Sequence, residues 1–338
     1  MKNKKLMGSV AIIFIILLVS FFSSQAQETS SPKKKIPEVG VLQYVSHPAL
    51  DEIYRGIKAG LKQEGYDPKK QTVKINFQNG QADQSKLKTM SEQLVNKQAD
   101  VLVGIATPAA QALANTTQKT PIVLGAITDP VSAGLVKSNE KPGGNITGVS
   151  DQSPVAAQIE LAKKLLPQAK KMGILYSSSE ANSEYQANKA STIAKKAGIE
   201  AKNFPVNSTN DLLTIVQEMA NQVDFIYIPT DNTIANAMQT VVGAANNAAT
   251  PIIPSVDTMV EQGGLATVGI NQYDLGVKTG QMVAMILKGK SKPATTPIYT
   301  FTKGDIIINQ EQAKKLGISI PDSIKQQATL VSADKTKK

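Results

Sequence analysis

The residues of this sequence that could do chemistry are hydroxyls, carboxylates and amides, because thiols and imidazoles are nearly absent. The 338 residues include no Cys, no Trp and one His. A thiol nucleophile, a thiolate metal site and a multi-histidine metal site are therefore excluded. A Ser-His-Asp triad could run only through His47. We therefore expect no enzyme, no metal site and no cofactor.

Candidate ligand-binding residues gather where predicted strands end. In an open α/β sheet, ligands bind beyond the carboxyl ends of the strands. Most residues at these ends carry a hydroxyl, carboxylate or amide group. The predicted ligand-binding set is Tyr44, Val45, Ser46, His47, Thr107, Ala109, Thr128, Asp129, Ser150, Asp151, Ser178, Glu180, Asn182, Tyr185, Thr230, Asp231 and Asp257.

These groups suit a zwitterion. Thr107 followed by Pro108 is typical of a helix N-cap with Pro at the first helical position. The free N–H groups of Ala109 and Ala110 behind it could receive a carboxylate without any arginine. An ammonium group needs a carboxylate partner, for which the candidates are Asp151, Asp231 and Asp257.

The side chain of such a ligand could be hydrophobic or aromatic, flanked by Tyr44, Tyr185 and Pro229. An alternative explains the same residues, since Ser, Thr and Asp at strand-to-helix turns also cap helices. His47 could likewise contact the ligand, sense pH or be an incidental loop residue before Pro48. The prediction therefore depends on the whole set and on no single member.

The elements that would position this set alternate between β-branched runs and amphipathic stretches, which indicates βαβ units and parallel sheets. The second half also repeats the first, which predicts two doubly wound parallel-sheet domains joined by a hinge of several crossings, an α/β fold. The matching segments are 39–43 with 172–176, 100–107 with 224–230, and 120–123 with 250–253.

The expected division of the chain follows from these repeats and from an apolar N-terminal run. The division is 1–26 as a signal peptide or N-terminal anchor, 27–35 as a linker, 36–150 with 272–297 as the first α/β domain, 151–271 with 298–330 as the second, and 331–338 as a disordered tail.

The formal charge of +10 lies mostly at the two ends. Nine of the 37 Lys and Arg residues, but two of the 27 Asp and Glu residues, lie within 1–35 and 333–338, so the rest carries about +3. Three lysines precede the uncharged run 6–22, and a small-x-small site ends at Ala26, which predicts an export signal or an uncleaved anchor. With one Arg and no basic stripe, we expect no nucleic-acid partner.

The chain carries four ordered motifs: YVSHPALD at 44–51, IATPAAQA at 105–112, TDPV at 128–131 and NITGVSD at 145–151. Together they resemble the substrate-binding proteins of ABC importers, in the branch assigned to tryptophan and related aromatic amino acids. The resemblance implies a type I periplasmic-binding-protein fold that closes on one ligand by a hinge. It implies that the loops at 44–47, 107–109, 128–129 and 150–151 face the ligand. Many relatives carry a lipid-anchoring Cys that this chain lacks.

We therefore predict a non-enzymatic, extracytoplasmic receptor that captures an amino acid, with tryptophan or another aromatic one favoured. It would deliver the ligand to a membrane permease powered by a separate ATPase. The protein is expected to be a monomer that is exported by its N-terminal signal and is either membrane-associated or secreted. The alternatives are a sugar or nucleoside receptor of the same fold, disfavoured by an aromatic content of 4%, and a ligand-sensing domain for a membrane signalling partner.

Overall fold

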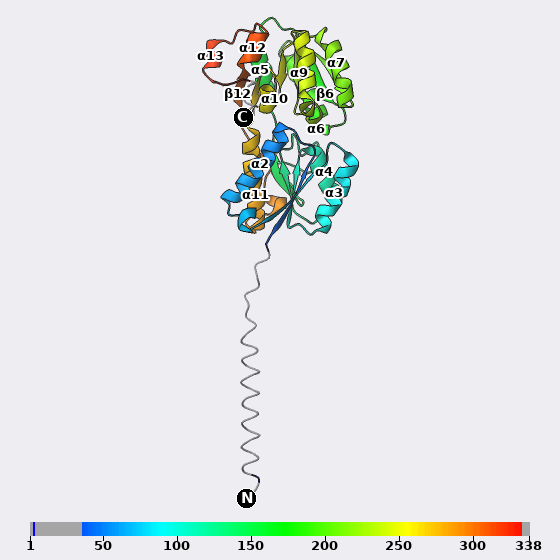
Figure 1. Cartoon of the computed structure of the whole chain (residues 1–338), viewed down its shortest axis with the longest axis vertical. Helices are drawn as coiled ribbons and strands as arrows, with labels where there is room; N and C mark the ends of the chain where they lie inside the picture. Colours follow the sequence, from blue (N-terminus) through cyan, green and yellow to red (C-terminus); the bar gives the residue numbers. More distant parts are fainter. Residues whose placement is uncertain (1–2, 4–35, 333–338) are drawn as a thin grey trace. The chain divides into compact units, whose positions relative to one another are not determined.

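The computed structural model describes residue 3 and residues 36–332. The predicted export signal, the linker and residues 333–338 lie outside the described residues. Residues 36–332 form two α/β lobes (Figure 1). The first lobe holds a six-stranded sheet, and the second holds a four-stranded and a three-stranded sheet. Within these residues, no helix combines the length and hydrophobicity that crossing a bilayer requires.

The first lobe begins with β-strands and helices in strict alternation. Its elements are β1 (Glu38–Gln43), α2 (Pro48–Gln63), a short 3-10 helix (Pro68–Lys70), β2 (Lys74–Asn79), α3 (Gln84–Asn96), β3 (Val101–Ile105), α4 (Thr107–Thr116), β4 (Ile122–Gly125), β5 (Ile146–Ser150), α11 (Gln272–Leu287), a 3-10 helix (Pro293–Thr295) and β11 (Tyr299–Thr300). The sheet order is β11-β5-β4-β3-β1-β2, and every pair is parallel.

The second lobe repeats this alternation around the parallel sheet β7-β6-β8-β9. Its elements are α5 (Val155–Leu165), β6 (Lys171–Ser177), α6 (Ala181–Lys196), β7 (Glu200–Val206), a 3-10 helix (Thr209–Asp211), α7 (Leu212–Ala220), β8 (Phe225–Ile228), α8 (Asn232–Asn236), α9 (Met238–Asn247), β9 (Ile252–Pro254), α10 (Asp257–Glu261), β10 (Ala266–Gly269), β12 (Asp305–Asn309), α12 (Gln310–Lys315), α13 (Asp322–Lys325) and β13 (Ala328–Val331).

The three-stranded sheet of the second lobe differs from the sequence prediction, which contained only parallel pairs. Its order is β10-β12-β13, with β10 and β12 antiparallel and β12 and β13 parallel. The antiparallel pair arises because the chain leaves this lobe after β10 and returns along β12 from the first lobe. The α/β class with parallel sheets is nevertheless confirmed.

Within the described residues, the chain passes between the lobes at three places. It crosses after β5, between β10 and α11, and between β11 and β12. Because β11 pairs with β5, Tyr299 and Thr300 lie at the edge of the first sheet. The sequence analysis had assigned them to the second domain. The domain of such a short strand is decided by the strand with which it pairs. A two-residue strand carries too little sequence pattern to predict that partner.

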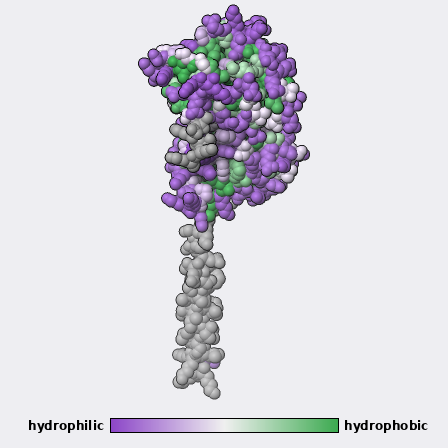
Figure 2. Space-filling model, turned by 45° about the horizontal axis from the view of Figure 1, so that its top comes forward, coloured by the Kyte–Doolittle hydropathy of each residue, from purple (hydrophilic) through white to green (hydrophobic). Residues whose placement is uncertain are grey.

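Buried hydrophobic side chains form one cluster in the first lobe and two in the second, one of which also includes Ala49 of α2. The strands of the parallel sheets carry long runs of buried residues, as in β1, β3 and β5. Such runs are typical of parallel strands that are covered on both faces. The face that Figure 2 shows is mostly polar, with scattered apolar patches.

Helices α2 and α11 approach each other backbone to backbone. Each carries two glycines four residues apart, Gly56 and Gly60 in α2 and Gly276 and Gly280 in α11. A Cβ atom added at Gly276 would lie 2.0 Å from the Ile53 carbonyl oxygen. Any side chain at this position would push the two helices apart, so glycine fixes how closely α11 packs on the first lobe.

We expect Gly276→Ala to lower the free energy of unfolding by at least about 1–3 kcal/mol, because it overpacks this contact. Gly243 of α9 is exposed and has no atom within 4 Å of an added Cβ. Gly243→Ala is therefore the matched control and should leave the stability unchanged or raise it by up to about 1 kcal/mol. Urea unfolding followed by circular dichroism measures both. A Gly276→Ala variant as stable as the control would contradict the packing argument.

Candidate functional site

A narrow pocket lies between the two lobes, beyond the carboxyl ends of their parallel strands. Its open volume is about 20 Å³, room for about one water molecule, so the lining side chains nearly close it. A larger hollow of about 680 Å³ lies between α3 and α4, away from these strand ends. The narrow pocket is lined by His47, Ala49, Leu50, Ala106, Thr107, Ala126, Thr128, Asp151, Asn182, Thr230, Asp231, Asn232, Ala235, Val256 and Gln272.

The structure brings part of the predicted ligand-binding set together in this pocket. Members come from both lobes and follow β1, β3, β4, β5, β6 and β8, as the strand-end argument requires. The predicted residues that line the pocket are His47, Thr107, Thr128, Asp151, Asn182, Thr230 and Asp231.

A second group of predicted residues lies close to the pocket without lining it. Burial and the nearby charges of Glu180 and Asp231 raise the pKa of Tyr44 to about 12. Asp257 borders a neighbouring hollow that shares Gln272 with the pocket. The remaining buried members of this group are Val45, Ala109, Ser150 and Glu180.

Tyr185 and Asp129 are half-buried, and neither lines the pocket. Burial raises the pKa of the Tyr185 hydroxyl, and a hydrogen bond with Asp129 raises it further. Asp129 also accepts a hydrogen bond of 2.7 Å from the Ser132 N–H. The two residues therefore link the two lobes outside the pocket.

The structure does not bring Ser46 or Ser178 to the pocket. Both are exposed. The Ser46 hydroxyl donates to the Asp51 carboxylate at 2.7 Å, and the Ser178 hydroxyl donates to Asn207 Oδ1 at 2.7 Å. Ser46 thus bonds within the first turn of α2, and Ser178 bonds the end of the neighbouring strand β7, so neither hydroxyl points to the pocket or caps a helix.

Asn232 and Gln272 line the pocket but were missed in the predicted set. Each is the first residue of a helix, Asn232 of α8 and Gln272 of α11. The preceding residues, Asp231 and Asn271, are N-caps whose side chains accept backbone N–H bonds. An Asp or Asn that caps a helix after a strand could have pointed to both residues. The residue that follows such a cap begins the helix at the strand end and so also faces the cleft.

The start of α4 differs by one residue from the prediction. Ala106, and not Thr107, is the N-cap, and Thr107 is the first helical residue. Ala106 has a φ of 72°, a strained backbone conformation of the kind that is common at binding sites. The Ala110 N–H is not free, since it donates to the Ala106 carbonyl at 3.1 Å. The N–H groups of Thr107 and Ala109 come before this first helical bond in the chain, so they have no acceptor within the helix.

Asp151 follows β5 and is the carboxyl group of the first lobe in the pocket. It is 7% exposed, and its Oδ1 atom has no hydrogen-bond partner in the described part of the chain. Burial raises the pKa of Asp151 to about 6, against a hydrogen bond with Thr128 that lowers it. Among the described residues, no Lys or Arg lines the pocket. An additional positive group would therefore stabilise the ionised carboxyl.

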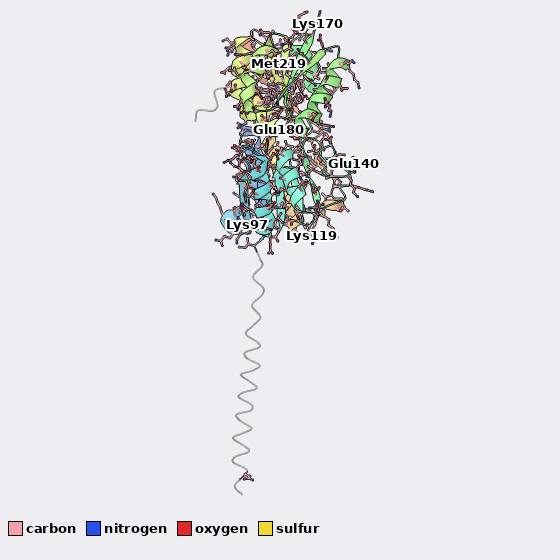
Figure 3. All side chains as sticks on the ribbon, turned by 90° about the vertical axis from the view of Figure 1, so that its right-hand side faces the viewer. Lys97, Lys119, Glu140, Lys170, Glu180 and Met219 are labelled. Atoms are coloured by element: carbon pink, nitrogen blue, oxygen red, sulfur yellow. The ribbon has the colours of Figure 1, made fainter. Side chains whose placement is uncertain are left out.

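Glu180 holds together the beginnings of α6 and α8 in the second lobe. Its buried carboxylate accepts hydrogen bonds from Asn182 Nδ2 at 3.2 Å and from Asn232 Nδ2. The Thr233 N–H and hydroxyl each donate to it at 2.8 Å. Figure 3 labels Glu180 among the side chains where the two lobes meet. The carboxylate thereby fixes the orientation of both pocket amides.

His47 forms a hydrogen bond across the pocket. Because Asn232 Nδ2 donates to Glu180, Asn232 Oδ1 is left to face His47 Nε2 at 3.2 Å. The Nε2 atom must then be the donor. Burial lowers the pKa of His47, which keeps the ring neutral, and Nδ1 has no partner among the described residues.

Two more buried carboxyl groups of the second lobe are held by backbone N–H groups. Asp231 accepts from Ser177 at 2.6 Å and Ile234 at 2.8 Å, and Asp257 accepts from Thr258 at 2.8 Å. Burial raises the pKa of each to about 7, and the charge of Glu180 adds to the rise at Asp231. Within residues 36–332, no three acidic or histidine side chains gather in a way that could hold a metal ion.

The fold and the pocket together define a two-lobed α/β protein with a nearly closed pocket between its lobes. The chain matches the family described as ABC transporter substrate binding protein over residues 38–332, and it belongs to that family. The family consists of binding components of transporters and not of enzymes. Its members work outside the cytoplasm with a permease. The family, the fold class and the transport role predicted from the sequence are therefore confirmed.

Relatives with names and solved structures are also similar over most of their length. The tyrosine-binding protein of Clostridioides difficile is 38% identical over 294 residues, covering 87% of this chain and 84% of the relative. The structure of an ABC domain in complex with L-Trp from Streptococcus pneumoniae is 51% identical, covers 87% of this chain and 99% of that chain, and has a TM-score of 0.85.

A ligand-free, open substrate-binding protein from Clostridium difficile gives a lower TM-score of 0.69, at 35% identity and with 88% and 100% of the chains covered. The higher score with the L-Trp complex agrees with the nearly closed pocket. A leucine-binding protein of Thermotoga maritima is 14% identical, covers 75% of this chain and 83% of that chain, and has a TM-score of 0.59. This similarity shows the type I fold alone.

We expect Asp151→Asn to stabilise the ligand-free protein at pH 8. In the unfolded chain Asp151 titrates at about 3.8, and in the folded chain at about 6. The folded state therefore holds more protons between these values, so its stability falls as the pH rises through this range. The variant removes a penalty of about 3 kcal/mol above pH 6 and little at pH 3.

The measurement is urea unfolding at the two pH values. Asp305→Asn, which alters an exposed side chain on β12, controls for the loss of a carboxyl group alone. A variant that is no more stable than wild type at pH 8 would show that burial does not destabilise the Asp151 carboxylate.

Proposed function

We propose that this chain captures an aromatic amino acid, tyrosine or tryptophan, in the pocket between its lobes and delivers it to the permease of an ABC importer. The ligands named for the relatives from Clostridioides difficile and Streptococcus pneumoniae, at 38% and 51% identity, support this substrate class. The observation that carries the proposal is the buried Asp151 Oδ1, which has no partner among the described residues, in a pocket that no described Lys or Arg lines.

The ammonium group of the ligand would bind Asp151. A buried carboxylate that lacks a partner is costly, and a cation beside it offsets the cost of desolvation. The hydroxyl of Thr128 already holds this carboxyl group from the first lobe. A primary ammonium would supply the missing donor and the missing positive charge at once.

The carboxylate of the ligand would bind the beginning of α4. The N–H groups of Thr107 and Ala109 have no helical partner, and a helix N-terminus favours an anion. Both residues are buried. Because β3, β4 and β5 are neighbours in the sheet, the α4 start and Asp151 lie on the same side of the pocket, as the two groups of an α-amino acid require.

The side chain of the ligand would lie between the lobes, against small apolar residues. Ala106, Ala126 and Ala235 line the pocket and leave room for a large group once the lobes separate. With about 20 Å³ open, entry requires a hinge motion, which we infer to occur at the three crossings. A sugar receptor is less favoured, because no aromatic ring for stacking is among the described lining residues.

We also propose that residues 1–26 direct export, on the evidence of their lysines and uncharged run. The remaining predicted residues, including Tyr44, Tyr185 and Asp257, would support the pocket from outside. The protein would act as a monomer that meets its permease in the closed, ligand-bound form.

Calorimetric titration with L-Trp and L-Tyr tests the proposal. Wild type should bind at least one of them, and Asp151→Asn should weaken binding about 30-fold or more, because it leaves the ammonium without its charged partner. Asp305→Asn should bind like wild type. If wild type binds neither amino acid, the substrate class is wrong, and if Asp151→Asn binds as tightly as wild type, the ammonium lies elsewhere.

A further inference from the structure

Asn182 presents a bare hydrogen-bond acceptor to the pocket. Its Nδ2 atom donates to Glu180 Oε2 at 3.2 Å and to the Thr230 carbonyl at 2.9 Å. Both partners are acceptors, so the amide cannot be flipped, and Oδ1 is the free end. The residue is 5% exposed, and no described residue donates to Oδ1. A buried acceptor in this position lacks a protein donor, and a ligand in the pocket can supply one.

His47 presents a second acceptor of the same kind. Since its Nε2 atom donates to Asn232 Oδ1, the neutral ring leaves the Nδ1 lone pair bare. His47 is 6% exposed and lines the same pocket. Both acceptors are oriented through Glu180, which binds the amides of Asn182 and Asn232. One buried carboxylate thus fixes two neutral acceptors.

In the proposed function, the side chain of the ligand, and not its ammonium group, would be the part that reaches Asn182. In the proposed function, the ammonium and carboxylate groups bind the first lobe at Asp151 and at the start of α4. Asn182 lies in the second lobe, in the first turn of α6. The ammonium would therefore already be bound in the first lobe, and the ring would extend toward Asn182.

We propose that the pocket selects aromatic amino acids whose ring carries a hydrogen-bond donor, a phenol O–H or an indole N–H, and that Asn182 Oδ1 is the specificity-determining acceptor. The proposal rests on the proposed function. A ring without a donor would displace water from the pocket and leave the acceptor buried and unpaired, which is costly. Sites built to bond a ligand donor reject analogues that lack it more strongly than apolar pockets reject a change of size.

Isosteric ligand pairs test the selection on the wild-type chain. 3-Benzothienyl-L-alanine replaces the indole N–H of L-Trp by sulfur, and 4-fluoro-L-phenylalanine replaces the hydroxyl of L-Tyr by fluorine. We expect each analogue to bind roughly 10- to 100-fold more weakly than its parent in calorimetric titration. Analogues that bind as tightly as their parents overturn this inference and leave the proposed function standing. Absence of binding by every aromatic amino acid overturns the proposed function instead.

The Asn182→Ala variant tests which residue makes the selection. The ratio of the two dissociation constants within each pair should fall to within about threefold, because the acceptor is gone. A purely structural role, or a bond to the ammonium, would weaken parent and analogue equally and keep the ratio. Asn207→Ala, at an exposed amide on the loop after β7, is the matched control and should keep it. A ratio that persists in Asn182→Ala overturns the assignment to Asn182.

Discussion

The pocket depends on one constraint, the burial of several carboxyl groups with no Lys or Arg among the described lining residues. Arg55, the one Arg of the chain, is paired with Glu52 on the exposed face of α2. Asp151, Glu180 and Asp231 must therefore be stabilised by backbone N–H groups, amides and hydroxyls. These donors are committed to the carboxyl groups, and two acceptors, Asn182 Oδ1 and His47 Nδ1, remain without a partner among the described residues. The free donors of the site are the Thr107 and Ala109 N–H groups at the start of α4. The site is consequently suited to a ligand that donates hydrogen bonds and carries positive charge.

Close packing of α2 on α11 positions two of the residues that line the pocket. His47 precedes the first residue of α2, and Gln272 is the first residue of α11. The glycines at their contact, such as Gly56 and Gly276, let the two helices touch backbone to backbone, which fixes the two helix starts relative to each other. The segment between β10 of the second lobe and α11 is one of the crossings between the lobes. The contact of α2 with α11 therefore also fixes the position of this crossing next to the pocket, which Gln272 lines.

Strand ends and internal repeats were sufficient to predict the fold class and part of the pocket. Asp151 and Asn182 were found because β-branched runs are visible in the sequence and ligands bind beyond such strands. Ser46 and Ser178 could not be separated from them, because a hydroxyl that bonds a neighbouring side chain and one that faces a ligand look alike in sequence. The start of α4 was missed by one residue, since the positive φ of Ala106 has no signature in an alanine. The mixed sheet was missed because pairing between β10 and β12 is set by the path through the first lobe.

The two lobes contribute different chemistry to the same pocket. The first lobe provides the carboxyl group of Asp151 and the N–H groups at the start of α4 that have no helical partner, which suit the charged head of an amino acid. The second lobe provides the neutral acceptor of Asn182, which Glu180 holds in place. Charge attracts any α-amino acid, so the first lobe alone cannot distinguish among them. Discrimination requires the lobes to meet, because only then is water excluded and an unpaired acceptor costly. In the proposed function, closure of the lobes is therefore the step that makes binding selective for the ligand side chain.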